Sequence, residues 1–186
     1  MKKALPVIFV IYVIGFIYLV LPSPQYPDLT GGVRSDEPGD TWQHPDQKGF
    51  YANEDRATIL KDIQSQYVIK IGNFSLPNFR LNYQPEEARI YVRDLLESYY
   101  LEEIIYPFRE SIFVNGWEPK KSPRYAKVLL AKDIPEISLH GIAYNSKITL
   151  KQTHSPAWAR ILVWTLTFPA AYIVYLSAKK SLFQNV

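Results

Sequence analysis

Residues 4–21 read ALPVIFVIYVIGFIYLVL, an apolar stretch without a single charged residue. A helix of this length spans about 27 Å, close to the roughly 30 Å hydrocarbon core of a bilayer. The other end of the chain carries a second apolar stretch, AWARILVWTLTFPAAYIVYLSA, at residues 157–178. The two stretches predict transmembrane helices within residues 1–22 and 155–180, with a short cytoplasmic tail at residues 181–186.

Basic and aromatic side chains flank both stretches in the way that membrane anchors do. Aromatic rings lie at the headgroup level of a bilayer, and long basic side chains reach toward the headgroups. The second stretch has no polar face at a period of 3.6 residues, which disfavours the buried helix of a soluble protein. The predicted anchors are Lys2, Lys3, Trp158, Arg160, Lys179 and Lys180.

The start of the chain sets the predicted orientation. Lys2 and Lys3 favour a cytoplasmic N-terminus. A cleaved signal peptide has the same charged start, but its apolar region is usually about 7–15 residues long and ends in a small-x-small site. The run here is longer and no such site follows it, which favours an uncleaved anchor. With two spans, both termini are cytoplasmic, and residues 23–157 lie outside the cytoplasm at the plasma membrane.

The charge balance bears on the partners. The chain has 21 basic and 18 acidic residues, and five of the basic ones lie at the apolar ends, which leaves 16 basic against 18 acidic residues between them. A protein that binds phosphate backbones needs a basic surface. We therefore expect no nucleic-acid partner. A lipid bilayer is the predicted partner, with a protein or a second copy of the chain as further possibilities, and no cofactor is indicated.

The part between the apolar ends is long enough for one domain. Prolines and glycines interrupt residues 23–52, which predicts a Pro-rich, acidic tether. Residues 53–154 are predicted to form an extracytoplasmic α+β domain with a mostly antiparallel sheet. The absence of Cys excludes a disulfide scaffold and Cys-rich zinc sites.

Local patterns predict the elements of that domain. Asn53 is a good N-cap, with Ile59, Leu60, Ile63 and Tyr67 at helical spacing behind it. A second helix is expected from Pro85, and residues 99–106 fit either a helix or a strand. Asn115-Gly116 is typical of a turn. Strands are expected at residues 67–71, 79–84, 111–114, 125–131 and 142–150.

An aromatic and basic stretch follows residue 98 and is the candidate interaction surface. Aromatic side chains dominate cores as well as binding surfaces, so both interpretations stay open. A basic cluster of this kind fits anionic headgroups, an acidic wall polymer or a solvated turn. The candidate residues are Tyr99, Tyr100, Tyr106, Phe108, Trp117, Lys120, Lys121 and Arg124.

Candidate chemistry is sparse, and no catalytic, cofactor-binding or metal-binding residue is predicted. His44, His140 and His154 have no partner His at helical spacing. The adjacent carboxylates Glu102 and Glu103 point in different directions on either a helix or a strand, unlike a catalytic pair. Four acids are candidates for a calcium site or for a solvated acidic linker, in a spacing that does not match an EF-hand loop: Asp36, Glu37, Asp40 and Asp46.

Three groups of residues look like segments of uncharacterised bacterial two-span membrane proteins. They are Ser35-Asp36-Glu37-Pro38-Gly39-Asp40, Arg80-Leu81-Asn82-Tyr83 with Pro85-Glu86-Glu87, and Leu101-Glu102-Glu103-Ile104 with Pro107-Phe108-Arg109-Glu110-Ser111. The resemblance covers most of the chain and implies a bacterial plasma-membrane protein, with no activity, cofactor or catalytic residue attached.

Three hypotheses for function follow from the sequence. The first is a non-enzymatic two-span membrane protein that presents its domain for partner binding or supports an envelope complex. The second is a membrane-tethered envelope hydrolase, whose catalytic groups would be assembled in space. The third is an accessory subunit of a transport or secretion complex, in which Gly15, Ala170 and Ala171 allow close contact between helices.

Overall fold

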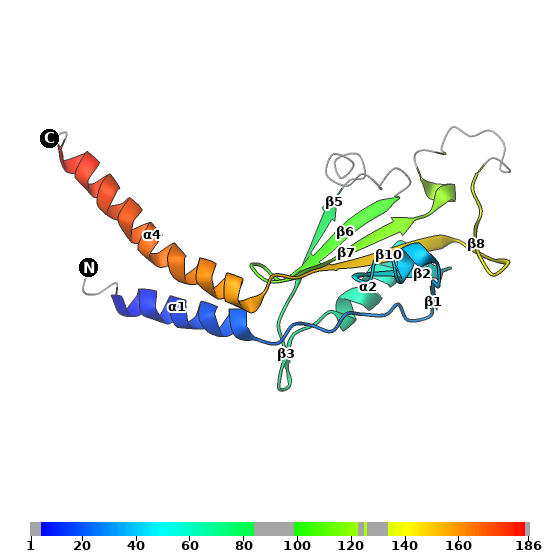
Figure 1. Cartoon of the computed structure of the whole chain (residues 1–186), viewed down its shortest axis with the longest axis horizontal. Helices are drawn as coiled ribbons and strands as arrows, with labels where there is room; N and C mark the ends of the chain where they lie inside the picture. The colour runs from blue at the N-terminus through cyan, green and yellow to red at the C-terminus, as the bar shows by residue number, and fades with distance from the viewer. Residues whose placement is uncertain (1–4, 84–98, 123–124, 126–133, 185–186) are drawn as a thin grey trace. The chain divides into compact units, whose positions relative to one another are not determined.

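The computed structural model describes residues 5–83, 99–122, 125 and 134–184 (Figure 1). The chain divides into two units. Unit 1 comprises residues 1–22 and 155–186, and unit 2 comprises residues 23–154. Each unit is described by itself.

Unit 1 holds the helices α1 (Leu5–Val20) and α4 (Ala157–Gln184), which contact each other. The Trp164 indole donates a hydrogen bond to the carbonyl oxygen of Tyr12 at 3.1 Å, and the rings of Tyr12 and Phe168 meet edge to face. Gly15 lies against the same indole, since a Cβ there would come within 2.2 Å of it. The close helix contact expected at Gly15 is therefore present.

Within the described residues, α4 alone is long and apolar enough to cross a membrane, over Ala157–Ser181 at a mean hydropathy of 1.6. The helix runs through Pro169 and ends at Gln184, so the residues 181–184 that were predicted as a tail continue it. α1 is a shorter apolar helix of 16 residues.

Unit 2 is built on a six-stranded antiparallel sheet with the order β1-β2-β10-β7-β6-β5. The predicted α+β class with a mostly antiparallel sheet is confirmed. The ambiguous stretch at residues 99–106 is a strand. The strands are β1 (Val33–Arg34), β2 (Gln47–Ala52), β5 (Phe79–Tyr83), β6 (Tyr100–Ile105), β7 (Ser111–Trp117) and β10 (Ser146–Thr153).

One face of this sheet forms the core with the helix α2 (Arg56–Gln66). The register of the strands places a set of buried apolar residues on that face. Arg56, the first residue of α2, contacts Glu102 and the Tyr100 ring on the same face. The buried side chains of α2 are the expected Ile59, Leu60 and Ile63, followed by Tyr67. The sheet contributes Ile104, Ile112, Val114, Ile148 and Leu150.

The helix begins two residues later than predicted. Asp55 is the N-cap, and its carboxylate accepts a hydrogen bond from the Thr58 backbone amide at 3.0 Å. Asn53 has another role, because its side-chain oxygen accepts from the Asn145 amide. Both residue types cap helices well, so tertiary contacts decide between them.

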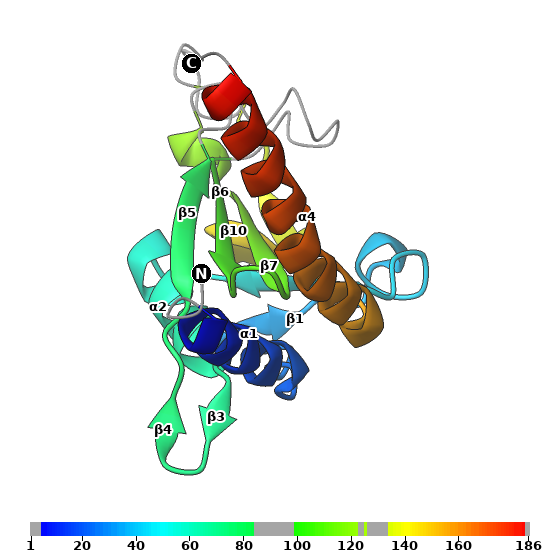
Figure 2. The ribbon, with the colours of Figure 1, turned by 90° about the vertical axis from the view of Figure 1, so that its left-hand side faces the viewer.

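Two hairpins lie beside the sheet. The first joins β3 (Lys70–Ile71) to β4 (Phe74–Ser75) and extends away from the sheet, as Figure 2 shows. Of the strand predicted at residues 67–71, only Lys70 and Ile71 form a strand, β3. The second joins β8 (Ile137–Leu139) to β9 (Ile142–Tyr144). The strand predicted at residues 142–150 is divided between β9 and β10.

The turn predicted at Asn115-Gly116 is wrong, because both residues lie inside β7. Gly116 is needed there for space: a Cβ would come within 2.1 Å of the Tyr100 ring on the neighbouring strand. The helix predicted from Pro85 lies outside the described residues, as does the strand predicted at residues 125–131 apart from Tyr125.

The segment predicted as a tether, residues 23–52, takes part in the sheet domain. It supplies β1, the 3-10 helix η1 (Pro38–Asp40) and β2, which pairs with β10 along its whole length. Pro38 begins η1, and the other prolines of this segment lie outside β1, η1 and β2, which is compatible with strand formation.

Candidate functional site

The candidate interaction surface does not form one patch. Tyr100 and Tyr106 are buried in unit 2 rather than available to a partner. The Tyr106 hydroxyl is within hydrogen-bond distance of the Ile69 amide at 3.0 Å and of the carbonyl oxygens of Tyr67 and Leu76. These two tyrosines are therefore structural residues, consistent with the core interpretation of the aromatic stretch.

Phe108 and Trp117 differ in their exposure to solvent. The Phe108 side chain is 77% exposed, in the turn between β6 and β7. Trp117 packs instead against the buried cluster of Tyr51, Ile137 and Leu139, which holds the β8–β9 hairpin to the sheet. Only the first of them is placed to meet a partner.

The basic residues of the candidate surface are partly neutralised. Lys121 forms an ion pair with the buried carboxylate of Glu118 at 2.7 Å, and its ammonium group lies over the Tyr99 ring. Lys120 is exposed beside it in the 3-10 helix η3 (Pro119–Lys121). Arg124 lies outside the described residues. This arrangement favours the solvated-turn interpretation of the basic cluster.

Sequence reasoning missed a buried ion cluster between α2, β5 and β6. Glu102 is almost fully buried, and its carboxylate accepts hydrogen bonds from the Arg56 guanidinium and pairs with Arg80 Nε at 3.0 Å. Arg56 also donates to Asn82 Oδ1 at 3.0 Å. No local pattern links Arg56 to an acid 46 positions away. The neighbouring Glu103 points to the other face, as expected, and accepts from the Tyr83 hydroxyl at 2.7 Å.

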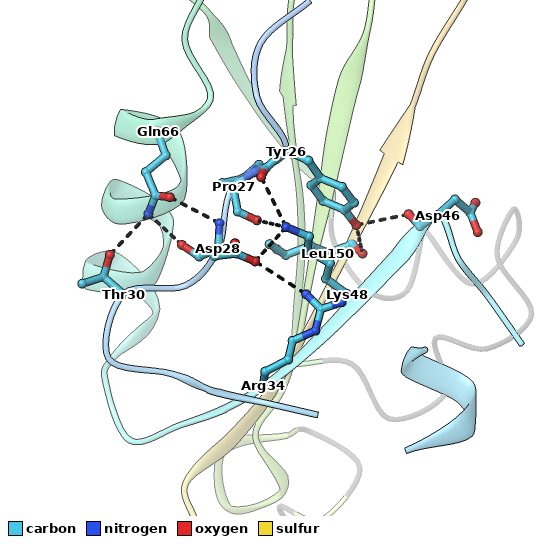
Figure 3. A network of polar contacts seen from close by, with 9 residues as sticks. All are labelled: Tyr26, Pro27, Asp28, Thr30, Arg34, Asp46, Lys48, Gln66 and Leu150. Atoms are coloured by element: carbon cyan, nitrogen blue, oxygen red, sulfur yellow. Dashed lines mark hydrogen bonds and ion pairs between the residues drawn. The ribbon is translucent and has the colours of Figure 1, made fainter. Parts of the chain in front are cut away.

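A second polar cluster ties the start of unit 2 to its sheet (Figure 3). Tyr26 donates from its hydroxyl to the carbonyl oxygen of Leu150 at 2.7 Å. Lys48 donates to the Asp28 carboxylate at 2.7 Å and to the carbonyl oxygens of Tyr26 and Pro27. Gln66 of α2 donates to the Asp28 carbonyl oxygen at 2.8 Å. Residues 26–30 are thereby held by both α2 and β2. A free, extended tether would not make these contacts.

The acids considered for calcium are engaged in ion pairs. Lys147 contacts Asp40 at 2.8 Å and Glu37 at 2.5 Å, and the Ser35 hydroxyl donates to Asp40 at 2.7 Å. Asp36 lies within hydrogen-bond distance of His140 Nε2, at 3.0 Å, on the surface. In the part of the chain that the structure describes, no group of three or more His, Cys, Asp or Glu residues is placed to hold a metal ion.

Charge pairing and burial shift several pKa values in unit 2. Burial by itself raises the pKa of Asp40, but hydrogen bonds from Lys147 and Ser35 outweigh it and hold that pKa below its ordinary value. The hydrogen bond to Glu103, together with burial, raises the pKa of the Tyr83 phenol to about 12. Both shifts favour the protonation state that completes a contact, which is how structural networks behave.

Exposed apolar side chains gather at one end of the sheet, here called the apolar end: Ile71, Phe74, Phe79 and Phe108. Phe79 pairs in register with Ile105, the last residue before the turn that carries Phe108. The Tyr106 hydroxyl fixes the base of the β3–β4 hairpin to the same turn. The apolar end is the described feature of unit 2 that most resembles a binding surface.

Comparisons of the chain with protein-family models, curated proteins and solved structures found no match. The likeness to two-span bacterial membrane proteins therefore stays a prediction. The description of function rests on the geometry of the chain itself.

Proposed function

We propose that the chain is a two-span membrane protein in which α1 and α4 anchor the sheet domain outside the cytoplasm, at the plasma membrane. The domain binds a protein partner or a second copy of the chain, or supports an envelope complex. Both termini then lie in the cytoplasm.

The observation that carries the proposal is the apolar surface of α4. Its large side chains are exposed along the whole helix, including Leu162, Val163, Leu166, Ile173 and Val174. Transfer of each such side chain out of water is worth about 1.5–3 kcal/mol. The apolar stretch of 25 residues is about 37 Å long, enough to cross a bilayer with some tilt. Lipid is the medium that accommodates such a surface.

The helix pair supports a second span. Tyr12 and Gly15 of α1 contact Trp164 of α4, so the two helices associate through a narrow strip and leave their other faces apolar and exposed. The 16 residues of α1 are about 24 Å long, and a shorter span is accommodated by local thinning of the bilayer. Lys2 and Lys3 favour the cytoplasm for the N-terminus.

The ion clusters of unit 2 favour binding over hydrolysis. The buried carboxylates of Asp40, Glu102 and Glu110 each pair with a Lys or Arg side chain. Glycosidase-type chemistry instead needs two carboxylates that face a cleft with separated pKa values. A domain with charges paired in this way is suited to present a rigid surface.

Topology is tested by single-cysteine labelling, which is clean because the chain contains no Cys. Ile142→Cys lies on the β8–β9 hairpin of unit 2, and Ser181→Cys lies near the end of α4; both side chains are exposed. In intact cells, a membrane-impermeant maleimide is expected to label the variant at position 142 and spare the one at position 181. Permeabilised cells, in which both label, are the control.

Labelling at position 181 together with protection at position 142 would reverse the proposed orientation. Labelling of both variants in intact cells would mean that α4 does not place its ends on opposite sides of the bilayer.

An accessory subunit of a transport or secretion complex is the second candidate, favoured by the contact of Gly15 with Trp164. In that case the helices, rather than the sheet domain, recognise the partner. Replacement of both helices by unrelated spans is expected to abolish assembly with a membrane complex under this candidate, and to leave partner capture by the sheet domain unchanged under the first.

A further inference from the structure

The apolar end has side chains whose exposure is unusual for a surface in water. Phe74 is 62% exposed and Phe108 is 77% exposed, with Ile71 and Phe79 nearby on the hairpin and on β5. Large apolar side chains that stay exposed at one end of a domain are typical of a site for another apolar phase or molecule. The question is which occupant the surroundings favour.

The β3–β4 hairpin is held firmly enough to present its tip. Gly72 occupies the first turn position with a φ of +59°, a conformation that glycine adopts without steric cost. At the base, the Leu76 amide donates to the Ile69 carbonyl oxygen at 2.9 Å, and the Tyr106 hydroxyl bridges both residues. Ile71 and Phe74 therefore project from a supported element.

Phe108 adopts a conformation that bulky residues avoid. Its φ is +62°, in the left-handed region, which is sterically unfavourable for such a residue. The cost is not offset by burial of the ring, since the ring points outward. The turn around it is fixed by the buried ion pair of Arg109 and Glu110 at 2.6 Å. The backbone is thus strained in a way that exposes an aromatic ring.

The charges around the apolar end suit an anionic surface. Residues 63–83 contain Lys70 and Arg80 and no acid, and residues 104–109 contain no acid. Glu110, next in the chain, is buried against Arg109. These segments therefore do not repel anionic phospholipid headgroups, and the positive charge of Lys70 attracts them.

Chain connectivity ties the same end of the sheet to α4. Thr153 pairs in register with Ser111, which follows the Phe108 turn, and only residues 154–156 separate β10 from α4. A link this short extends about 14 Å at most. If α4 crosses a bilayer, the strand end beside the Phe108 turn is bound to stay near the bilayer surface.

We infer that Ile71, Phe74 and Phe108 insert into the headgroup region of the bilayer that α4 crosses, and so fix how the sheet domain stands on the membrane. This inference rests on the proposed function. The occupant is lipid rather than a second copy of the chain, because the segments lack acids and are tied to α4. Insertion of apolar side chains to this depth is how interfacial segments bind membranes.

The test places an environment-sensitive fluorophore on single cysteines of the full chain in phospholipid vesicles that contain phosphatidylglycerol. Phe74→Cys and Phe108→Cys probe the apolar end. Ile142→Cys is the matched control, since its side chain is 60% exposed on a hairpin at the opposite end of the sheet. Ala170→Cys, in the middle of α4, reports whether that helix lies in lipid, through quenching by spin labels fixed at the centre of the acyl chains. Far-UV circular dichroism confirms that each variant is folded.

The labels at positions 74 and 108 are expected to show blue-shifted emission and quenching by spin labels placed near the lipid headgroups, while the label at position 142 shows neither. Emission at positions 74 and 108 equal to that at position 142, with position 170 quenched, overturns the insertion and leaves the proposed function intact. Shielding at position 74 without quenching by lipid assigns the surface to a protein contact and also overturns it. Loss of quenching at position 170 contradicts the proposed function itself.

Discussion

Helices α2 and α4 both carry many apolar side chains, and they differ in what surrounds them. In α2, Ile59, Leu60 and Ile63 are buried on one side, and the remaining positions are mostly polar. In α4, apolar side chains such as Leu166 and Val174 are exposed on every side, apart from the strip that meets α1. The first helix is completed by the sheet of its own unit, whereas the second has no protein partner for most of its surface.

The difference shows how the two helices derive their stability. The face of α2 is stabilised by removal from water, so each buried group contributes to the folding of unit 2. The surface of α4 gains nothing from folding in water and is compatible with lipid. Shortening an apolar side chain is therefore expected to destabilise unit 2 when it is made in α2 and to leave unit 2 unchanged when it is made in α4.

The largest expected effect comes from shortening a buried side chain of α2. Ile63→Ala should lower the free energy of unfolding of unit 2 by about 2–5 kcal/mol, because Ile63 is fully buried. Urea unfolding of the full chain in nanodiscs, followed by circular dichroism, measures this. Leu166→Ala in α4 is the matched control and should leave the unfolding of unit 2 unchanged. Equal effects of the two substitutions would contradict the contrast.

Low pH is expected to affect the two units differently, because unit 1 contains no Asp or Glu whereas unit 2 does. The folded-state pKa of Asp40 lies below its unfolded value, so its contribution is complete above about pH 4 and is lost as the pH falls through the folded value. Asp40→Asn should cost about 1.5–3 kcal/mol at pH 7, since the lost hydrogen bonds involve charged groups.

The cost of Asp40→Asn, measured by urea unfolding, should shrink below about pH 4, because the wild-type carboxyl is then protonated in the unfolded state and, at still lower pH, in the folded state as well. Glu136→Gln, at an exposed position just before β8, provides the control. A cost that does not change between pH 7 and pH 3 would show that the ion pair with Lys147 does not stabilise unit 2.

A third contrast concerns a single methyl group. Gly116→Ala brings a Cβ within 2.1 Å of the buried Tyr100 ring and should destabilise unit 2 by about 1–3 kcal/mol. Gly39→Ala has open space around it and should be near neutral. Thermal unfolding of both variants measures the difference, and a Gly116→Ala variant as stable as Gly39→Ala would mean that β6 and β7 are not packed as described.

The smallest effect is expected at the sheet surface. The hydrogen bond from Tyr83 to Glu103 raises the pKa of the phenol to about 12, so Glu103→Gln should lower that pKa toward 10. Absorbance titration of tyrosinate, compared with that of Tyr83→Phe to identify the signal, measures the shift. An unchanged titration in Glu103→Gln would exclude the contact as its cause.

Local patterns sufficed for part of the fold. The apolar ends are helices, and Ile59, Leu60, Ile63 and Tyr67 occupy the buried positions that their spacing predicted. The alternation that predicted the strand at residues 79–84 appears as β5, although most of its side chains are exposed. The periodicity of apolar residues therefore predicts that a strand forms, but it does not predict whether its side chains are buried by the rest of the chain.

Non-local contacts explain most of what the sequence did not predict. β2 reads QKGFYA, which has little strand character of its own, and it forms because Phe50 pairs with Ile148 almost a hundred residues later. Asn115-Gly116 has the local preference of a turn, but pairing on both sides of β7 overrides it. Glu102 on β6 pairs with Arg56 of α2 and Arg80 of β5, so its partners come from two other elements. The apolar end likewise joins a hairpin and a distant turn.

The most direct test of the central claim is the depth of α4 in lipid. A fluorophore is placed at Leu162→Cys, Ala170→Cys and Ser177→Cys of the full chain in vesicles, with spin labels fixed at the centre of the acyl chains. A helix that crosses the bilayer predicts the strongest quenching at position 170 and weaker quenching at positions 162 and 177. Equal quenching at all three positions would mean that α4 lies flat on the membrane, and no quenching would mean that it lies in water; either result contradicts the account.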